Sequence, residues 1–532
     1  IVRRLVGSEM CIRDSDTTLR DGAQQSGISL SLKDKINITL KLDELGIDTI
    51  EGGYAGSNPK DDEYFRVIQK ENIKNSKISA FGSTRKPDAN IESDIIVNAL
   101  LDSEAEVLTV VGKSSSKQVL KVLETSLDEN LKMIEETINF LSKRDRRVIY
   151  DAEHFFDGFY TDKNYAIKTL ITAYESGADT VTLCDTNGGM IPEDIEKVLV
   201  EVKKHIDPSK LGIHCHNDTD TAVACTLSAF NEGVAHIQGT VNGYGERCGN
   251  TNLISLIANL YFKKGISLLS EEKMKSLTEV SNFVSDTVNR TPFPYAPYVG
   301  SMAFTHKGGM HASAVNKYVD SYQHMNPEKV GNLSNITVSE LAGRSNVISR
   351  LKELDILDKF NDDDIKNVTS FIKNKENNGF SYEVASASLE LLLKKEKRLT
   401  KPPFNLIEYD VRLKSTNLDK ENQCTASIKL SINEIEIEKT AIGNGPVAAL
   451  DKALREALLK FYPSLDKVKL TDYKVRVVNE SEATESIVRV SIESADDKEV
   501  WTTVGASSNI IEASWMALSD SMEWWLIKNI ID

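Results

Sequence analysis

The stretch Leu211–Asp218, with the sequence LGIHCHND, is the starting point for both the fold and the site. It looks like a short buried strand that ends at two histidines. Because residues two apart in a strand point to the same face, the imidazoles of His214 and His216 should lie side by side. Two neutral imidazoles directed at one point can bind a divalent metal ion. An HxH pair seen alone is more often structural, so the other motifs must decide.

Similar apolar, β-rich runs recur along the chain at intervals of about thirty residues, the size of one βα unit. They lie at residues 47–50, 78–81, 107–111, 147–150, 180–183, 211–215 and 237–241. Segments with helical periodicity, such as LKDKINITLKLDELG at 32–46, lie between them. With one more strand before Asp16 the pattern predicts an α/β fold, a (β/α)8 TIM barrel. A doubly wound open sheet is the alternative, but no GxGxxG motif follows the first strand.

A barrel of this kind gathers its active residues at the C-terminal ends of the strands. Polar and charged residues follow almost every predicted strand. Each could be an ordinary solvated loop residue, but a ring of them around one barrel mouth favours a site. The ring comprises Arg20, Asp21, Glu51, Ser83, Thr84, Arg85, Asp151, Glu153, His154, Asp185, Thr186, His214, His216, Asn242, Glu246, Arg247 and Asn250.

Composition restricts the class of protein. The net charge of -16 argues against a nucleic-acid or anionic membrane surface, because both need a basic patch. The six cysteines have no CxxC pair or regular spacing, which is typical of reduced cytosolic thiols. No apolar run approaches the ~20 residues of a membrane span. We therefore expect a soluble cytoplasmic protein.

We expect four segments. Residues 1–15, IVRRLVGSEMCIRDS, show neither the apolar core of a signal peptide nor a convincing strand pattern, and this predicts an irregular, foreign or mis-spliced segment that leaves strand one in question. Residues 16–267 should form the barrel, and 268–400 a helical linker subdomain. Pro402 and Pro403 mark the boundary to a C-terminal domain at 404–532.

The C-terminal domain contains two similar halves. FNLIEYDVRLKS at 404–415 parallels VKLTDYKVRVVN at 468–479, and the segments that follow are parallel too. Each half should form three strands and a helix, with a glycine-rich turn before the helix at Gly443 and Gly445 or at Gly505. Since no catalytic cluster occurs here, the residues predict a regulatory or dimerisation domain with an internal pseudo-twofold.

Three motifs in order resemble a known family. DTTLRDG at 16–22, HCHND at 214–218 and GYGERCGNTN at 243–252 are similar to the acyl-CoA-condensing metalloenzymes that include isopropylmalate, homocitrate and citramalate synthases. AFGSTR at 80–85, YDAEHFFDG at 150–158 and CDTNGG at 184–189 most resemble the citramalate-forming type. The resemblance extends from Asp16 to the C-terminus.

This resemblance implies a metal site and a set of pocket residues. It assigns Asp21, His214, His216 and, as a weaker ligand, Asn250 to Mg²⁺, Mn²⁺ or Zn²⁺. The remaining barrel residues that it implies are Arg20 for the alkoxide, Thr186 for the substrate carboxylate, Asp151 as a substrate-binding residue, and Glu51 and Glu153 as acidic residues that orient Arg20 and acetyl-CoA or the attacking water, with Glu153 catalytic. Phe81, at the end of the third predicted strand, is expected to fill the pocket and favour pyruvate's methyl group over a branched chain. Arg20 could also form a salt bridge to Glu51 or to another carboxylate at the barrel mouth, and the two roles are compatible.

The linker contributes a candidate base. THKGGMHASAV at 305–315 resembles the subdomain that reaches over the barrel mouth in this family, often from the partner subunit. By that resemblance His306 helps to deprotonate the acetyl-CoA methyl group, and Tyr322 assists. His311 is the alternative base.

The implied activity is a homodimeric acyltransferase that condenses acetyl-CoA with pyruvate to (R)-citramalate and CoA, the first step of a threonine-independent route to isoleucine. Isopropylmalate or homocitrate synthesis, and a lyase or aldolase of the same barrel superfamily, are alternatives. A catalytically silent amino-acid sensor is the alternative from another class. The C-terminal domain should bind isoleucine or leucine as a feedback effector.

Overall fold

A computed structural model describes residues 12–306, 309–318, 321–336, 344–382, 385–414, 423–478 and 486–531. The chain divides into two compact units. The first contains the residues up to 304 together with 325–333, and the second contains 305–324 together with 334 onward. Each unit is described separately below.

The first unit is a closed barrel of eight parallel strands, as predicted, in the order β1 to β8. Each strand pairs with its sequence neighbours, and β1 closes the barrel against β8, with Asp14 opposite Ile237. The strands are β1 (Arg13–Asp16), β2 (Thr49–Tyr54), β3 (Lys77–Ser83), β4 (Val107–Lys113), β5 (Arg147–Glu153), β6 (Thr180–Asp185), β7 (Leu211–Cys215) and β8 (His236–Gly239). The barrel prediction is therefore confirmed.

Strand β1 corrects one expectation. Residues 13–15 belong to the segment that we expected to be irregular, yet they form an ordered strand with Asp16. Its sequence, RDSD, has no apolar residue, which hid it from a hydropathy pattern. The hydrogen bonds to β2 on one side and β8 on the other stabilise it instead. Residues 1–11 lie outside the described part of the chain.

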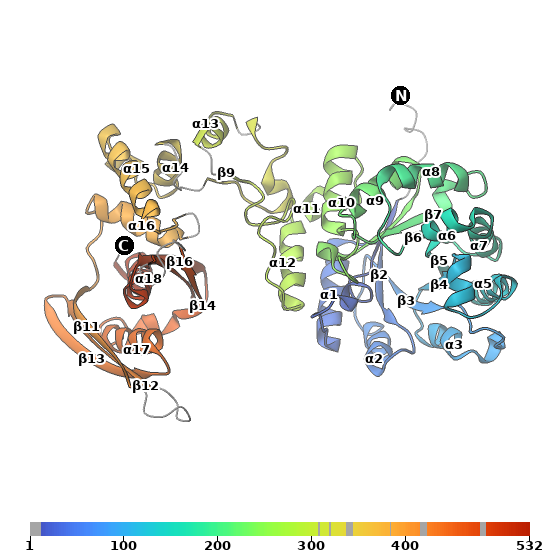
Figure 1. Cartoon of the computed structure of the whole chain (residues 1–532), viewed down its shortest axis with the longest axis horizontal. Coiled ribbons are helices and arrows are strands. Elements are labelled where there is room, and N and C mark those ends of the chain that lie inside the picture. Colours follow the sequence, from blue (N-terminus) through green and yellow to red (C-terminus); the bar gives the residue numbers. More distant parts are fainter. Residues whose placement is uncertain are drawn as a thin grey trace. The chain divides into compact units, whose positions relative to one another are not determined.

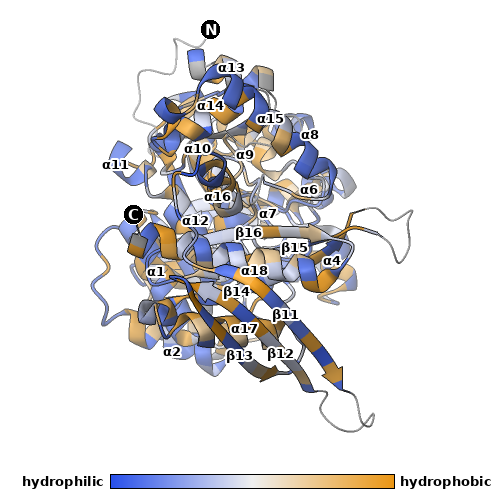
Figure 2. Cartoon of the chain, turned by 90° about the vertical axis from the view of Figure 1, so that its left-hand side faces the viewer, coloured by the Kyte–Doolittle hydropathy of each residue, from blue (hydrophilic) through white to orange (hydrophobic). Residues whose placement is uncertain are grey.

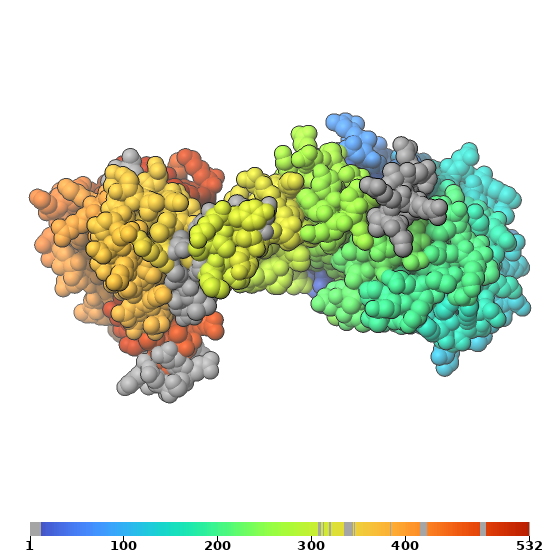
Figure 3. Space-filling model, turned by 90° about the horizontal axis from the view of Figure 1, so that it is seen from above, coloured from blue at the N-terminus to red at the C-terminus, as the bar shows by residue number. Residues whose placement is uncertain are grey.

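Helices surround the barrel strands (Figure 1). Helix α1 shows why they form where they do: Ser31 and Asp34 make a reciprocal capping box at its start, and Gly46 ends it with a φ of 99°. The barrel helices are α1 (Leu32–Leu45), α2 (Pro59–Ile68), α3 (Ile95–Asp102), α4 (Ser116–Lys121), α5 (Leu127–Ser142), α6 (Phe155–Thr161), α7 (Lys163–Glu175), α8 (Pro192–Val202), α9 (Ala222–Asn231) and α10 (Leu253–Asn259). Their apolar faces and the strands form one core, and the barrel segments pack into a single body in the space-filling view (Figure 3).

The region that we expected to be a helical linker is divided between the units. Helices α11 (Glu271–Met274) and α12 (Leu277–Thr287) belong to the first unit. The second unit begins with a two-stranded parallel sheet of β9 (Thr305–His306) and β10 (Asn335–Ile336). Its helices are α13 (Gly309–Lys317), α14 (Arg344–Glu353), α15 (Asp362–Asn377) and α16 (Ser386–Glu396).

The C-terminal part repeats one motif, as the sequence predicted. Strands β11 (Asn405–Lys414), β12 (Gln423–Ile432) and β13 (Ile435–Gly443) form an antiparallel sheet, followed by α17 (Pro446–Leu458). Strands β14 (Lys469–Val477), β15 (Val488–Ala495) and β16 (Val500–Ser507) form a second one, followed by α18 (Ile510–Leu526). The third strand of each sheet lies close to the helix that follows it: a Cβ on Gly505 would lie 2.0 Å from the Ala513 carbonyl oxygen, so only glycine fits there.

The first strand of each C-terminal sheet carries exposed apolar side chains. Hydrophobic and hydrophilic residues alternate along β11 (Figure 2), and Ile407 and Leu413 are exposed. Val475 and Val477 are exposed on β14, and Val477 matches Leu413 in the repeat. Within the described ranges, no helix is long and apolar enough to cross a membrane.

Candidate functional site

The turn after β1 presents two charged side chains at the barrel mouth. Asp16 shapes this turn, because its carboxylate accepts hydrogen bonds from the backbone N–H of Thr18 at 2.9 Å and from the Thr18 hydroxyl at 2.8 Å. The Thr18 oxygen in turn accepts from the backbone N–H of Val241, which follows β8. The turn after β1 is thereby joined to the segment after β8. The turn holds Arg20 and Asp21 in place.

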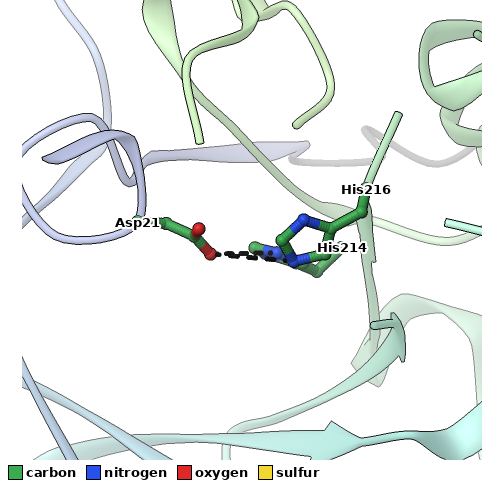
Figure 4. Close-up of side chains that lie close together, drawn as sticks. All are labelled: Asp21, His214 and His216. Atoms are coloured by element: carbon green, nitrogen blue, oxygen red, sulfur yellow. Dashed lines mark ion pairs between the residues drawn. The ribbon is translucent and has the colours of Figure 1, made fainter. Parts of the chain in front are cut away.

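Asp21, His214 and His216 come together at this mouth (Figure 4). His214 Nε2 lies 3.4 Å from Asp21 Oδ2, and His216 Nε2 lies 4.0 Å from the same oxygen. All three side chains are buried, and one ligand atom from each lies within 4.8 Å of the others. Among the described residues, this is the one group of three or more His, Cys, Asp or Glu side chains close enough to hold a metal ion.

Asn250 lies beside this cluster. It forms an isolated antiparallel bridge with His216, and its side-chain Nδ2 donates to the Tyr244 carbonyl at 3.3 Å. Its Oδ1 is buried and has no hydrogen-bond partner. The close approach depends on Gly245, where a Cβ would lie 2.4 Å from Asn250 Nδ2.

Asp21 and His216 have the ionisation states that metal ligands need, a carboxylate and a neutral imidazole. Burial opposes ionisation of Asp21, but the Arg20 guanidinium and the two imidazoles outweigh it and hold the pKa of Asp21 well below its ordinary value. Burial lowers the pKa of His216 to about 4, so its imidazole is neutral near pH 7. Burial also tends to lower the pKa of His214, but the effect of the Asp21 carboxylate is larger and the pKa is raised.

Two buried oxygens at the cluster have no hydrogen-bond partner, and a bound metal ion would take the place of one. Asp21 Oδ1 and Asn250 Oδ1 are both buried without a hydrogen bond. A buried polar atom without a partner costs free energy, on the order of 1–3 kcal/mol, unless something fills the role. Two imidazole nitrogens with carboxylate and amide oxygens form a mixed N/O donor set that suits a divalent cation.

Arg20 lies between the cluster and the apolar wall of the cavity. Its Nε donates to Glu51 Oε1 at 2.5 Å, and its Nη1 donates to Asp21 Oδ2 at 2.9 Å. Its guanidinium lies 4.0 Å from the centroid of the Phe81 ring. Desolvation opposes its charge, but Glu51 and Asp21 outweigh this and keep the pKa of Arg20 above its ordinary value. The fork is therefore held in one orientation.

A cavity of about 370 Å³ opens at this place. Tyr54 and Phe81 meet edge to face in its wall, with ring centroids 5.4 Å apart. The residues that line it are Arg20, Asp21, Gln24, Tyr54, Phe81, Val111, Asp151, Glu153, Cys184, Thr186, His214, His216, Glu246 and Arg247. Glu51 was expected as a substrate-binding residue but does not line the cavity. Its carboxylate is buried and contacts Arg20, so it acts on the cavity through that side chain.

Other expected residues occupy the rim. Glu153 ends β5 and forms an ion pair with Lys113 at the end of β4. The Thr186 hydroxyl oxygen accepts a hydrogen bond from the backbone N–H of His154 at 2.8 Å, so its own proton is free to point at a ligand. The backbone carbonyl of Thr186 accepts from Arg247 at 2.7 Å. The side chains at the C-terminal ends of β4 to β6 are therefore fixed by contacts between neighbouring loops.

Sequence reasoning missed Gln238. It lies on β8, is 1% exposed, and connects Asp151 on β5 with His214 on β7. Burial and the nearby Glu51 charge raise the pKa of Asp151 to about 6. In the sequence, Gln238 stands out only as a single amide inside the apolar run 237–241. This position does not reveal which barrel residues its side chain contacts.

His306 and Tyr322 belong to the second unit. His306 is 9% exposed, and its Nε2 lies 3.1 Å from the amide nitrogen of Gln323. Burial, with a smaller contribution from His311, lowers the pKa of His306. Tyr322 stacks on His311, with ring centroids 4.1 Å apart and an interplanar angle of 19°. Both histidines thus have a neighbour that restricts their rings.

Comparison with known proteins finds three family models along the chain. An HMGL-like model matches residues 12–284, a homocitrate synthase post-HMGL domain-like model matches 298–379, and a LeuA allosteric (dimerisation) domain model matches 383–526. The chain is 48% identical to an (R)-citramalate synthase of Aquifex aeolicus, over 97% of either chain. It is 45% identical to one of Geobacter sulfurreducens over 97% of either chain, and 44% identical to one of a Synechocystis strain over 96% of this chain and 95% of the relative.

Proposed function

The chain belongs to the (R)-citramalate synthase family, and we propose that it condenses acetyl-CoA with pyruvate and water to give (R)-citramalate and CoA. A bond forms between the acetyl methyl carbon and the keto carbon of pyruvate, and water then cleaves the thioester and releases the thiol. The observation that carries the proposal is the convergence of Asp21, His214, His216 and Arg20 on one cavity. An HMGL-like barrel supplies the scaffold.

Asp21, His214 and His216 would hold a divalent metal ion, with Asn250 Oδ1 as a fourth, weaker ligand. Bound there, the ion would act as a Lewis acid on the substrate's keto group. One carboxylate and two neutral imidazoles leave coordination positions for a bidentate 2-oxo acid. The donor set accommodates Mg²⁺, Mn²⁺ or Zn²⁺.

Arg20 would stabilise the negative charge that develops on the keto oxygen when its carbon is attacked. A guanidinium held by Glu51 and Asp21 needs little reorganisation during the reaction, which is the condition for strong electrostatic stabilisation. Glu51 is then a positioning residue. Its burial beneath the guanidinium fits that role better than contact with the substrate.

The cavity wall would select the 2-oxo acid. The free proton of the Thr186 hydroxyl can donate to the substrate carboxylate. Phe81, packed between Arg20 and Tyr54, would narrow the cavity wall and so favour the methyl group of pyruvate over a larger side chain. Asp151 accepts a hydrogen bond from Gln238 at the base of the cavity. Glu153, at the rim, would orient acetyl-CoA or the attacking water.

His306 would remove a proton from the acetyl-CoA methyl group, with Tyr322 assisting. A methyl group next to a thioester is a weak carbon acid and needs a positioned base. The lowered pKa of His306 keeps its imidazole neutral and able to accept a proton at pH 7. His311, stacked on Tyr322, is the alternative base.

The C-terminal domain would dimerise the enzyme and bind an end-product amino acid. The match to a LeuA allosteric (dimerisation) domain and the exposed apolar strands β11 and β14 support this. Isoleucine is the effector expected for a citramalate route, and leucine for an isopropylmalate route. Calorimetric titration of the full chain with each amino acid, together with light scattering for its mass, tests both statements. If neither isoleucine nor leucine binds, the domain has a structural role only.

A thiol-release assay tests the reaction. The full chain is supplied in turn with Mg²⁺, Mn²⁺ and Zn²⁺ and with acetyl-CoA, together with pyruvate, 2-oxobutyrate, 2-oxoisovalerate or 2-oxoglutarate. Release of CoA should be fastest with pyruvate and should stop when a chelator is added. A preference for 2-oxoisovalerate would indicate isopropylmalate synthesis, and one for 2-oxoglutarate homocitrate synthesis. No release with any acid would defeat the enzyme assignment and favour a silent amino-acid sensor.

A further inference from the structure

A buried amide connects the interior of the barrel to one of the clustered histidines. Gln238 Oε1 lies 2.8 Å from His214 Nδ1, and Gln238 Nε2 donates to Asp151 Oδ1 at 2.9 Å. Gln238 is 1% exposed and Asp151 is 3% exposed. The three residues come from three strands, β8, β5 and β7, so the chain of hydrogen bonds depends on the closed barrel.

The direction of each hydrogen bond follows from the chemistry of the groups. An ionised carboxylate only accepts, so Asp151 fixes which end of the Gln238 amide is the donor. The other end is then a carbonyl oxygen, which also only accepts. His214 must therefore carry a proton on Nδ1. Its Nε2, 3.4 Å from Asp21 Oδ2, is left as the nitrogen that can bind a cation.

The neighbouring histidine has no such support. His216 Nδ1 is buried and has no hydrogen-bond partner. Its tautomer and ring angle are therefore set by packing and by whatever binds its Nε2. Of the two imidazoles, only His214 has its tautomer fixed in advance by a side chain.

We propose that Gln238 is a positioning residue that fixes the tautomer and ring orientation of His214 and thereby sets the affinity of the site for a divalent cation. The inference rests on the proposed function only in assuming that the cluster of Asp21, His214 and His216 binds a metal. Residues that orient a metal-binding histidine in this way change affinity or activity by about 10–100-fold when they are removed. The competing view is that Gln238 merely satisfies a buried Asp151 and serves stability alone.

The same strand offers a matched control. His236 lies two residues before Gln238 and therefore on the same face of β8. It is 2% exposed, and neither of its ring nitrogens has a hydrogen-bond partner. Replacement of either residue by methionine puts a similar side chain into the same interior. Only the replacement at Gln238 removes the acceptor of His214.

The test measures metal binding directly. Full-length protein is treated with chelator, and binding of Mn²⁺ is titrated by electron paramagnetic resonance for the wild type, Gln238→Met and His236→Met. The Kd should rise about 10–100-fold in Gln238→Met and stay within about threefold in His236→Met. Equal Kd values for the wild type and a folded Gln238→Met would overturn the proposal, as would equal losses in both variants.

A double variant keeps the proposal testable if Gln238→Met does not fold. Asp151→Asn combined with Gln238→Glu exchanges donor and acceptor, so both hydrogen bonds can form and His214 still donates from Nδ1. Its Kd should stay within about threefold of the wild type, whereas Asp151→Asn combined with Gln238→Met offers His214 Nδ1 no acceptor and should bind about 10–100-fold more weakly. Equal Kd values for these two combinations contradict the proposal.

The proton itself can be observed. In the wild type loaded with Co²⁺, the shifted ring N–H of His214 should exchange slowly with solvent, because it is buried and donates to Gln238. The slow signal should persist in His236→Met and in the double variant of Asp151→Asn with Gln238→Glu. Its absence from the wild type would refute the assigned tautomer. None of these readouts needs turnover, so a wild type that releases no CoA would sink the proposed function alone.

Discussion

Arg20 Nε donates to Glu51 Oε1 at 2.5 Å, and this contact joins the turn after β1 to the middle of the neighbouring strand β2. The carboxylate is buried, so its one strong partner is the guanidinium above it. A lysine at position 20 could keep the charge but could not donate to Glu51 and Asp21 in the same planar geometry. The orientation of this fork underlies the first prediction.

Arg20→Lys should lower kcat for CoA release with pyruvate by about 10²–10³-fold, with a smaller change in KM. The reason is that stabilisation of the developing oxyanion depends on a preorganised donor. Steady-state kinetics with metal supplied measures it, and Arg66→Lys on the outer surface of α2 is the control. A kcat within threefold of the wild type would show that a positive charge alone, without the guanidinium geometry, stabilises the developing oxyanion.

Asp21→Asn should weaken divalent metal binding strongly, by about tenfold or more, because it removes the one formal negative charge among the ligand residues. Mn²⁺ titration of chelator-treated protein measures the Kd, and Asp363→Asn on the exposed side of α15 is the control. Tight binding retained in Asp21→Asn would place the metal elsewhere.

Phe81→Ala should admit larger 2-oxo acids. Removal of the ring that lies between Arg20 and Tyr54 opens the cavity wall, so the ratio of kcat/KM for 2-oxobutyrate to that for pyruvate should rise about 10-fold or more. The thiol-release assay with the two acids measures the ratio. An unchanged ratio, with overall activity retained, would remove Phe81 from the specificity wall.

Asp16→Asn should make the stability of the barrel less dependent on pH. Burial raises the pKa of Asp16 to about 7, against 3.8 for the unperturbed group. The folded state therefore binds the proton more tightly, and Asp16 contributes stability below about pH 4 that is lost as the pH rises through 7. As the pH rises from about 4 to 8, the free energy of unfolding of the variant should increase relative to that of the wild type. The difference should reach about 4 kcal/mol at pH 8.

Calorimetric unfolding at pH 5 and pH 8 measures this effect. Tryptophan fluorescence serves as an internal control, because all four tryptophans, Trp501, Trp515, Trp524 and Trp525, lie in the C-terminal domain and report on the second unit. An equal difference between variant and wild type at the two pH values would contradict the assignment.

His306→Asn should lower kcat by about 10²–10⁴-fold, because it removes the base proposed for the acetyl-CoA methyl group. His311→Asn is the matched variant, since both histidines lie in the same segment. Exchange of the methyl protons of acetyl-CoA into deuterated water separates this step from thioester cleavage. A larger loss in His311→Asn would reverse the assignment of the two histidines.

Much of the fold could be predicted from the sequence because its signals are local and periodic. Buried strands such as Leu211–Cys215 are apolar runs, and α1 carries its own capping box. The repeat in the C-terminal domain is visible as parallel segments of sequence and appears as two sheets with the same strand order. Strand β1 was expected before Asp16 but stayed in doubt, because RDSD is stabilised by neighbouring strands and not by a local apolar pattern.

The sequence by itself determined which residues are available at the barrel mouth. Strand ends gather at one edge, and this placed Arg20, Asp21, His214 and His216 on one rim before any distance was known. Only the tertiary structure decided how they contact one another. A salt bridge to Glu51 was one role expected for Arg20 from the sequence, and the structure confirms it. That Gln238 connects Asp151 with His214 depends on the register and closure of eight strands, and such contacts between residues far apart in the chain leave no local pattern.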